Sequence, residues 1–135
     1  MNLPTAFQLA GCAHLVSLGA IIAAPRQLNW TAELARLPKL LRQMCNAYHY
    51  YTTATIAACG LASLFLADEL AQTSGLSRAL CGYIALFWAV RLVLQFSYDS
   101  RPHLTTAALR LGYHGLSALF VAFIGFYGWA ALRSG

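Results

Sequence analysis

The chain has little charge of either sign. Only 10% of its 135 residues are charged, and just four of these are acidic. A soluble domain devotes about a quarter of its residues to charge, so this composition excludes an ordinary soluble protein. Of the whole chain, 59% of the residues are hydrophobic, and the mean hydropathy is +0.58. These values are typical of an integral membrane protein whose partner is the lipid bilayer.

Closely spaced cysteines are also missing. The four cysteines are scattered, without a C-x-x-C pair or the spacing of a metal site, at Cys12, Cys45, Cys59 and Cys81. This excludes a cysteine-based zinc site and a disulfide framework. A buried cysteine then acts as a small hydrophobic residue, and we expect no bound metal ion.

The first residues carry no positive charge. A secretory signal peptide begins with a basic segment, whereas residues 1–4 read MNLP. We therefore expect the first apolar stretch to be retained as a membrane helix.

Four apolar stretches are long enough to cross a bilayer, which takes about 20 helical residues. They cover residues 5–24, 44–66, 80–98 and 106–132. Because they use nearly the whole chain, the sequence predicts one all-α transmembrane domain over residues 1–135, folded as an antiparallel four-helix bundle. Between the first two stretches, leucines and charges alternate at helical spacing. This pattern predicts a short interfacial amphipathic helix over 31–42, capped by Thr31 and bent or broken at Pro38. It is either a simple connector or a helix that docks a partner or senses lipid.

The basic residues concentrate in alternate loops. One side of the membrane would hold Arg26, Arg36, Lys39, Arg42 and Arg101. The positive-inside rule places these residues in the cytoplasm and both termini on the other side, and we expect a bacterial inner membrane. Because the basic residues flank membrane helices, nucleic acid is not an expected partner.

A lone arginine lies well inside the third apolar stretch. Arg91 in a spanning helix costs about 3 kcal/mol on insertion scales, so it normally faces protein or water. It shares one helical face with Ile84, Trp88, Gln95 and Tyr98. In the fourth stretch, Arg110, His114 and Ser117 align in the same way beside Tyr113. We expect the two polar faces to meet at similar depths, with Asp99 as the only carboxylate nearby.

This one-sided polarity predicts a cytoplasm-facing pocket for an anionic or amphipathic ligand, such as a lipid headgroup or a carboxylated metabolite. The candidate binding residues are Trp88, Arg91, Gln95, Tyr98, Arg110, Tyr113, His114, Tyr48 and His49. If the ligand also reacts, His49 or His114 is the candidate acid or base. Alternatively, the arginines only extend to the lipid headgroups.

Two other function classes fit the sequence. A four-helix membrane protein can bind haem b between two histidines. Of His14, His49 and His114, the pair His14 and His114 is closest to matched depths. The chain can instead be a structural or assembly subunit or a small transporter protomer, in a homo-oligomer or a larger membrane complex.

Four segments resemble patterns in small four-helix bacterial membrane proteins of no assigned function. These segments are LNWTAELARLPKLLRQM, FWAVRLVLQFSYD, RPHL and GYHGL. The resemblance implies no activity or cofactor, but it indicates that Trp88, Arg91 and Gln95 form one motif.

Overall fold

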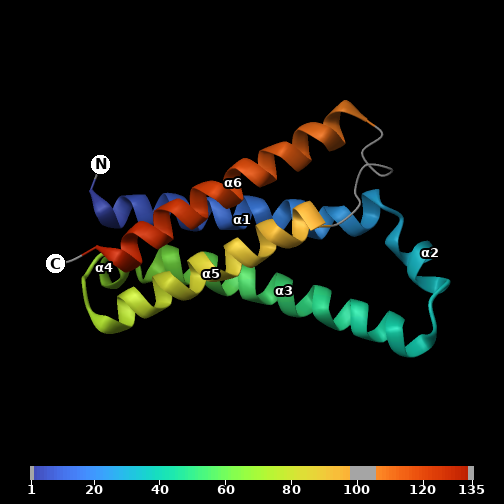
Figure 1. Ribbon diagram of the computed structural model, residues 1–135, viewed down its shortest axis with the longest axis horizontal. Coiled ribbons are helices and arrows are strands. Elements are labelled where there is room, and N and C mark those ends of the chain that lie inside the picture. Colours follow the sequence, from blue (N-terminus) through green and yellow to red (C-terminus); the bar gives the residue numbers. More distant parts are fainter. Residues whose placement is uncertain (1, 98–105, 134–135) are drawn as a thin grey trace. The chain divides into compact units, whose positions relative to one another are not determined.

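The computed structural model describes residues 2–97 and 106–133, and these residues are almost entirely helical. No β-strand occurs among them. The helices are α1 (Leu3–Gln27), α2 (Trp30–Ala35), α3 (Lys39–Phe65), α4 (Ala67–Leu70), α5 (Gly75–Ser97) and α6 (Ala107–Leu132), coloured in chain order in Figure 1.

Three of these helices, α1, α5 and α6, are long and apolar enough to cross a membrane. The chain is therefore a helical integral membrane protein. The longest helix, α3, is not among the three, because its first half carries basic residues, tyrosines, a histidine and threonines.

The segment between α1 and α3 differs from the predicted interfacial helix over 31–42. Helix α2 ends at Ala35, and α3 already begins at Lys39. Pro38 explains the interruption, since its ring disfavours helical backbone at the residue before it. The predicted cap at Thr31 is wrong: the N-cap position belongs to Asn29, whose backbone is left-handed with φ 51° and whose side chain makes no capping hydrogen bond.

Contacts divide the chain into two compact units. In the unit of residues 8–65, α1 packs against α3 through two glycines. A Cβ atom on Gly11 would lie 2.7 Å from Cγ of Leu64, and one on Gly60 would lie 2.9 Å from Cβ of His14. Small residues thus let the two helices approach closely.

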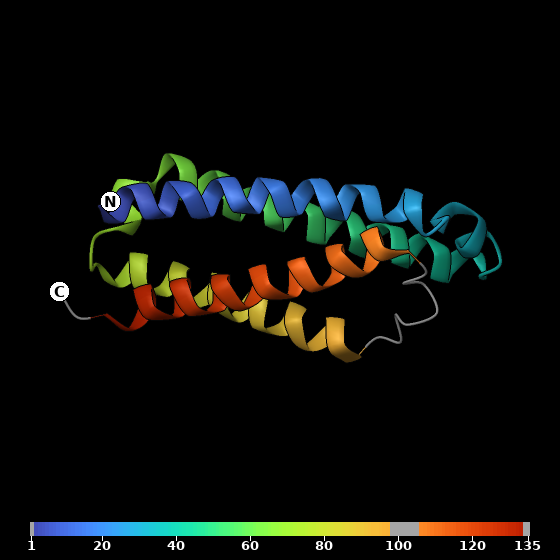
Figure 2. The same cartoon turned by 90° about the horizontal axis from the view of Figure 1, so that it is seen from above.

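The second unit contains residues 66–133 together with the start of α1 up to Phe7. Its centre is the antiparallel pair of α5 and α6, which lie side by side in both views (Figures 1 and 2). Trp88 is fully buried, with its ring centroid 4.7 Å from that of Phe120 and 4.8 Å from that of Phe123. Farther along α6, Tyr127 contacts Phe7. Aromatic packing therefore forms the core of this unit.

Two arginines secure one end of the α5 and α6 pair. Arg133 follows α6 and donates from Nη2 to the carbonyls of Leu70 (2.9 Å) and Gln72 (3.0 Å), where α4 ends. From α5, Nε of Arg78 donates to the carbonyl of Ala131 near the end of α6, at 2.9 Å. Each guanidinium thus satisfies carbonyls that a helix end leaves without partners.

Candidate functional site

Gln95 and Tyr113 link α5 to α6 by hydrogen bonds in both directions. Nε2 of Gln95 donates to the Tyr113 carbonyl (3.3 Å) and to the Ser117 hydroxyl, while the Tyr113 hydroxyl donates to the Gln95 carbonyl (3.2 Å). The structure thus brings together two of the predicted ligand-binding residues. Their polar groups bond to the facing helix, which is a structural role.

The register of this pair places the predicted arginines at different levels. Gln95 lies opposite Tyr113 and Ser117, so His114 is level with it. Arg91 lies one turn beyond Gln95 in one direction, and Arg110 lies almost one turn beyond Tyr113 in the other. Counted from the level of His114, Arg110 is four residues away, so at 1.5 Å per residue the two arginines are about 12 Å apart along the helix axes. The similar depth expected for them is not observed.

Exposure separates these residues further. Trp88 is buried and Arg91 half-buried, whereas Arg110 and His114 are exposed. Two residues invoked from the sequence, Tyr98 and Asp99, lie outside the described residues.

The remaining predicted residues, Tyr48 and His49, lie on α3 in the other unit. The Tyr48 side chain is 64% exposed. His49 is half-buried, with its ring 4.8 Å from that of Trp30 in an edge-on contact. His49 also lines a cavity, which makes it the predicted residue with the clearest place in a site.

This cavity, of about 290 Å³, lies where the end of α1, the short helix α2 and the start of α3 come together. Its lining residues are Ile22, Pro25, Arg26, Trp30, Thr31, Leu34, Arg42, Asn46, His49 and Tyr50. We call it the basic cavity. The left-handed backbone at Asn29 changes the direction of the chain after α1, and Pro38 allows a second change of direction before α3. These two local features place α2 beside the first turns of α3.

The polar lining of the basic cavity is cationic or neutral. Arg26 and Arg42 supply two guanidinium groups, and no carboxylate of the described residues lines the cavity. The acidic residue of α2, Glu33, instead forms an ion pair with Arg36 at 3.5 Å, outside the cavity. Ile22, Pro25 and Leu34 add apolar wall. Such a lining suits an anion that carries an apolar part.

Comparison with protein-family models, curated protein sequences and solved structures finds no match. The function must therefore be argued from the site alone.

The histidines proposed as haem ligands have separate surroundings. His14 is fully buried, and its Nδ1 lies 2.8 Å from the carbonyl of Ala10, one turn earlier in the same helix. His114 belongs to the other unit, where its ring lies 5.4 Å from that of Tyr113. Within the described ranges, no group of three or more His, Cys, Asp or Glu residues is placed to hold a metal ion.

Sequence reasoning missed most of the basic cavity. It assigned Arg26 and Arg42 to membrane orientation, and it gave Trp30 and Asn46 no role in a site. A signal was available, since these residues and His49 all lie in or beside the segment that connects the first two apolar stretches. Their convergence depends on how that segment folds.

Proposed function

We propose that the protein binds an anionic amphiphile, such as the headgroup of an acidic lipid, in the basic cavity. The observation that carries this proposal is the pair of arginines, Arg26 and Arg42, in one cavity that no carboxylate within residues 2–97 and 106–133 lines. Guanidinium groups bind phosphate and carboxylate oxygens through paired N–H donors. The proposed ligand class is the one expected from the sequence. The proposed site, however, lies around His49 and not around Arg91.

The remaining lining residues suit the other parts of such a ligand. Asn46 and Thr31 offer neutral hydrogen-bonding groups, and Trp30 and Tyr50 offer rings of the kind found at membrane interfaces. Ile22 and Leu34 lie where an acyl chain would begin. His49, beside Trp30, is the residue that would exchange a proton with the bound ligand if the ligand reacts.

The proposal includes a placement in the membrane. Helix α3 is the fourth span, its polar first half being covered by protein or headgroups, so that the chain forms a four-helix bundle in a bacterial inner membrane with both termini outside. The excess of basic residues around the segment between α1 and α3 supports this orientation. The cavity would then open at the cytoplasmic leaflet, where acidic lipids attract basic groups.

The test is lipid retention by the purified protein. The protein is placed in nanodiscs of phosphatidylcholine containing some phosphatidylglycerol, and the retained lipids are identified by native mass spectrometry. Arg26→Gln and Arg42→Gln should each lower phosphatidylglycerol retention about tenfold, the value of one charged hydrogen bond. Hexyl phosphate and hexanoate in neutral detergent show whether a free anion binds in the same way.

Arg36→Gln is the matched control. It removes the same charge from the same connecting segment, but the Arg36 side chain is 78% exposed, pairs with Glu33 and does not line the cavity. If all three variants reduce retention equally, the effect comes from general surface charge and the proposed site is wrong.

A further inference from the structure

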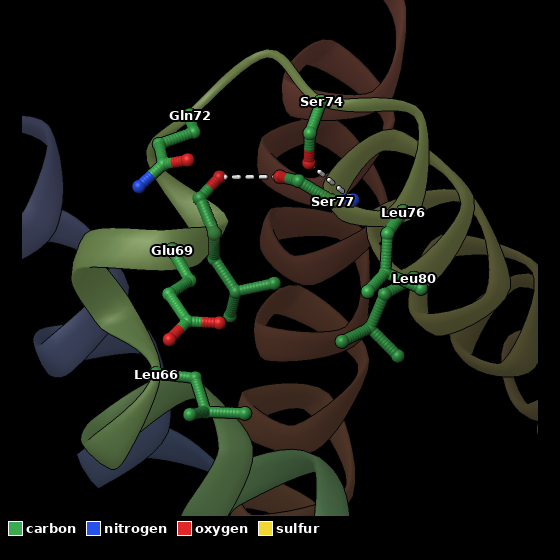
Figure 3. A pocket seen from close by; sticks show the side chains of 8 residues that line it. Leu66, Glu69, Gln72, Ser74, Leu76, Ser77 and Leu80 are labelled. Atoms are coloured by element: carbon green, nitrogen blue, oxygen red, sulfur yellow. Dashed lines mark hydrogen bonds between the residues drawn. The ribbon is translucent and has the colours of Figure 1, made fainter.

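A second cavity lies in the other unit, between α4 and the start of α5. It measures about 340 Å³ and is lined by Leu66, Glu69, Leu70, Gln72, Ser74, Leu76, Ser77 and Leu80. We call it the acidic cavity. Figure 3 shows the Glu69 side chain on the α4 side, with Leu66 below it and Leu76 and Leu80 across on α5. One carboxylate therefore shares this space with several leucines.

Part of the polar lining is already hydrogen-bonded. The Ser77 hydroxyl donates to the Leu70 carbonyl at 2.8 Å, and the Ser74 hydroxyl accepts from the backbone N–H of Ser77 at 3.1 Å. The dashed lines in Figure 3 mark these two bonds. Leu70 and Ser77 are both buried, at 2% and 5% exposure. They form a closed floor whose polar groups need no ligand.

The Glu69 carboxylate is the charged group of the cavity lining. Within residues 2–97 and 106–133, the ion pair between Arg36 and Glu33 is the only one, so no basic side chain of that part of the chain forms an ion pair with the exposed Glu69. The two arginines at this end of the unit, Arg78 and Arg133, direct their guanidinium groups to backbone carbonyls. The exposed Glu69 carboxylate is therefore accessible to a cationic ligand.

The leucines around Glu69 indicate what kind of cation fits the cavity. Leu76 is 79% exposed and Leu66 is 43% exposed, although both line the cavity. A simple metal cation would gain nothing from apolar walls and prefers several oxygen ligands. A cation with an apolar chain would contact the carboxylate and the leucines together.

We infer that the acidic cavity binds an organic ammonium group that carries an apolar chain, with Glu69 as its counterion. This ligand has the opposite charge from the one proposed for the basic cavity, and the inference does not depend on that proposal. The ammonium can belong to a free amine or to an ethanolamine lipid, since both present the same cationic group.

Binding of hexylammonium to the protein in a neutral maltoside detergent tests the inference. Calorimetry should show that Glu69→Gln weakens binding about two- to fivefold, the range for an exposed ion pair. Asp68→Asn is the matched control, because it removes the same charge from the adjacent exposed residue, which does not line the cavity. It should change the dissociation constant by less than about twofold.

Two further probes separate the contributions of charge and chain. Tetramethylammonium, which has no chain, and hexanol, which has no charge, should both bind more weakly than hexylammonium. Leu76→Asn, at an exposed position where folding is not at risk, should reduce the preference for the longer chain. Equal effects of the Glu69 and Asp68 variants, or hexanol binding as tightly as hexylammonium, would overturn the inference.

The source of the ammonium is settled by a lipid experiment. The wild-type protein and Glu69→Gln are compared in nanodiscs that contain both phosphatidylethanolamine and phosphatidylglycerol. Selective retention of phosphatidylethanolamine by the wild type alone assigns the site to a lipid headgroup. Binding of hexylammonium without such retention assigns it to a free amine.

Discussion

Gln95 and Tyr113 each bond to the backbone carbonyl of the other. The Gln95 amide lies 3.3 Å from the Tyr113 carbonyl, and the Tyr113 hydroxyl lies 3.2 Å from the Gln95 carbonyl. This exchange links α5 to α6 in a single register. These bonds give Gln95 and Tyr113 a structural role, whereas the sequence alone assigned both residues to ligand binding.

Replacing Gln95 by Leu should therefore weaken the pairing of α5 and α6. The change removes the donor to Tyr113 and Ser117, and polar contacts between membrane helices contribute about 0.6 to 2 kcal/mol. Unfolding in mixed micelles with a denaturing detergent measures the loss. Tyr113→Phe should have a smaller effect, and Ser97→Ala should have almost none, because the Ser97 hydroxyl bonds within its own helix to Val93. Full stability of the Gln95 variant would contradict this role.

Two glycines of α1 should respond in opposite ways to an added methyl group. In Gly11→Ala the new Cβ would meet Leu64 at 2.7 Å and the Gly60 carbonyl oxygen at 2.8 Å, so α1 and α3 must separate. We expect a loss of about 1 to 3 kcal/mol. In Gly19→Ala nothing lies within 4 Å, so the variant should gain up to about 1 kcal/mol from helix propensity. Thermal unfolding of both variants in one detergent checks this difference.

Arg133→Gln should loosen the end of α4. The two bonds from its guanidinium to the carbonyls of Leu70 and Gln72 would be lost. Because hydrogen bonds of charged groups are worth about 1.5 to 3 kcal/mol, hydrogen exchange at the amides of residues 70–72 should accelerate at least about tenfold. In Arg78→Gln the increase should instead fall at the end of α6, where Arg78 bonds to Ala131. The same exchange pattern in both variants would show that the two arginines have no separate roles.

Pro38→Ala should join α2 to α3. Without the proline ring, residues 36–38 can continue the helix, and helical content measured by circular dichroism should rise by about one turn. The basic cavity would lose its shape, so anion binding should fall as well. Pro25→Ala should leave helical content unchanged, since Pro25 already lies within α1. Unchanged content in the Pro38 variant would show that another feature ends α2.

Much of the secondary structure was predictable. The long apolar stretches predicted helices over 5–24, 80–98 and 106–132, and α1, α5 and α6 cover these ranges except at two ends. Tyr98 lies outside the described residues, and Thr106 is the N-cap of α6. The break at Pro38 was also foreseen, because its cause is local to the chain. The end of the preceding helix at Ala35 was not foreseen. The helical spacing of leucines and charges continues past Pro38, so this pattern alone does not show where the helix ends.

The roles of the polar residues were not predictable in the same way. The helical spacing of Trp88, Arg91 and Gln95 correctly placed them on one face, but only the antiparallel register of α5 and α6 decides what that face meets. There Trp88 packs among phenylalanines and Gln95 bonds to Tyr113.

The sequence by itself determined that this is a helical membrane protein, because apolar composition and the length of its apolar runs are properties of the chain alone. The tertiary structure decided where charges gather. Arg26 and Arg42 are 16 residues apart and enter one cavity only because of the turns at Asn29 and Pro38. The spacing of residues along one helix is a local property that the sequence shows directly. Which residues of separate helices come together depends on the connecting turns and on packing, and the pattern within one helix gives no information on these.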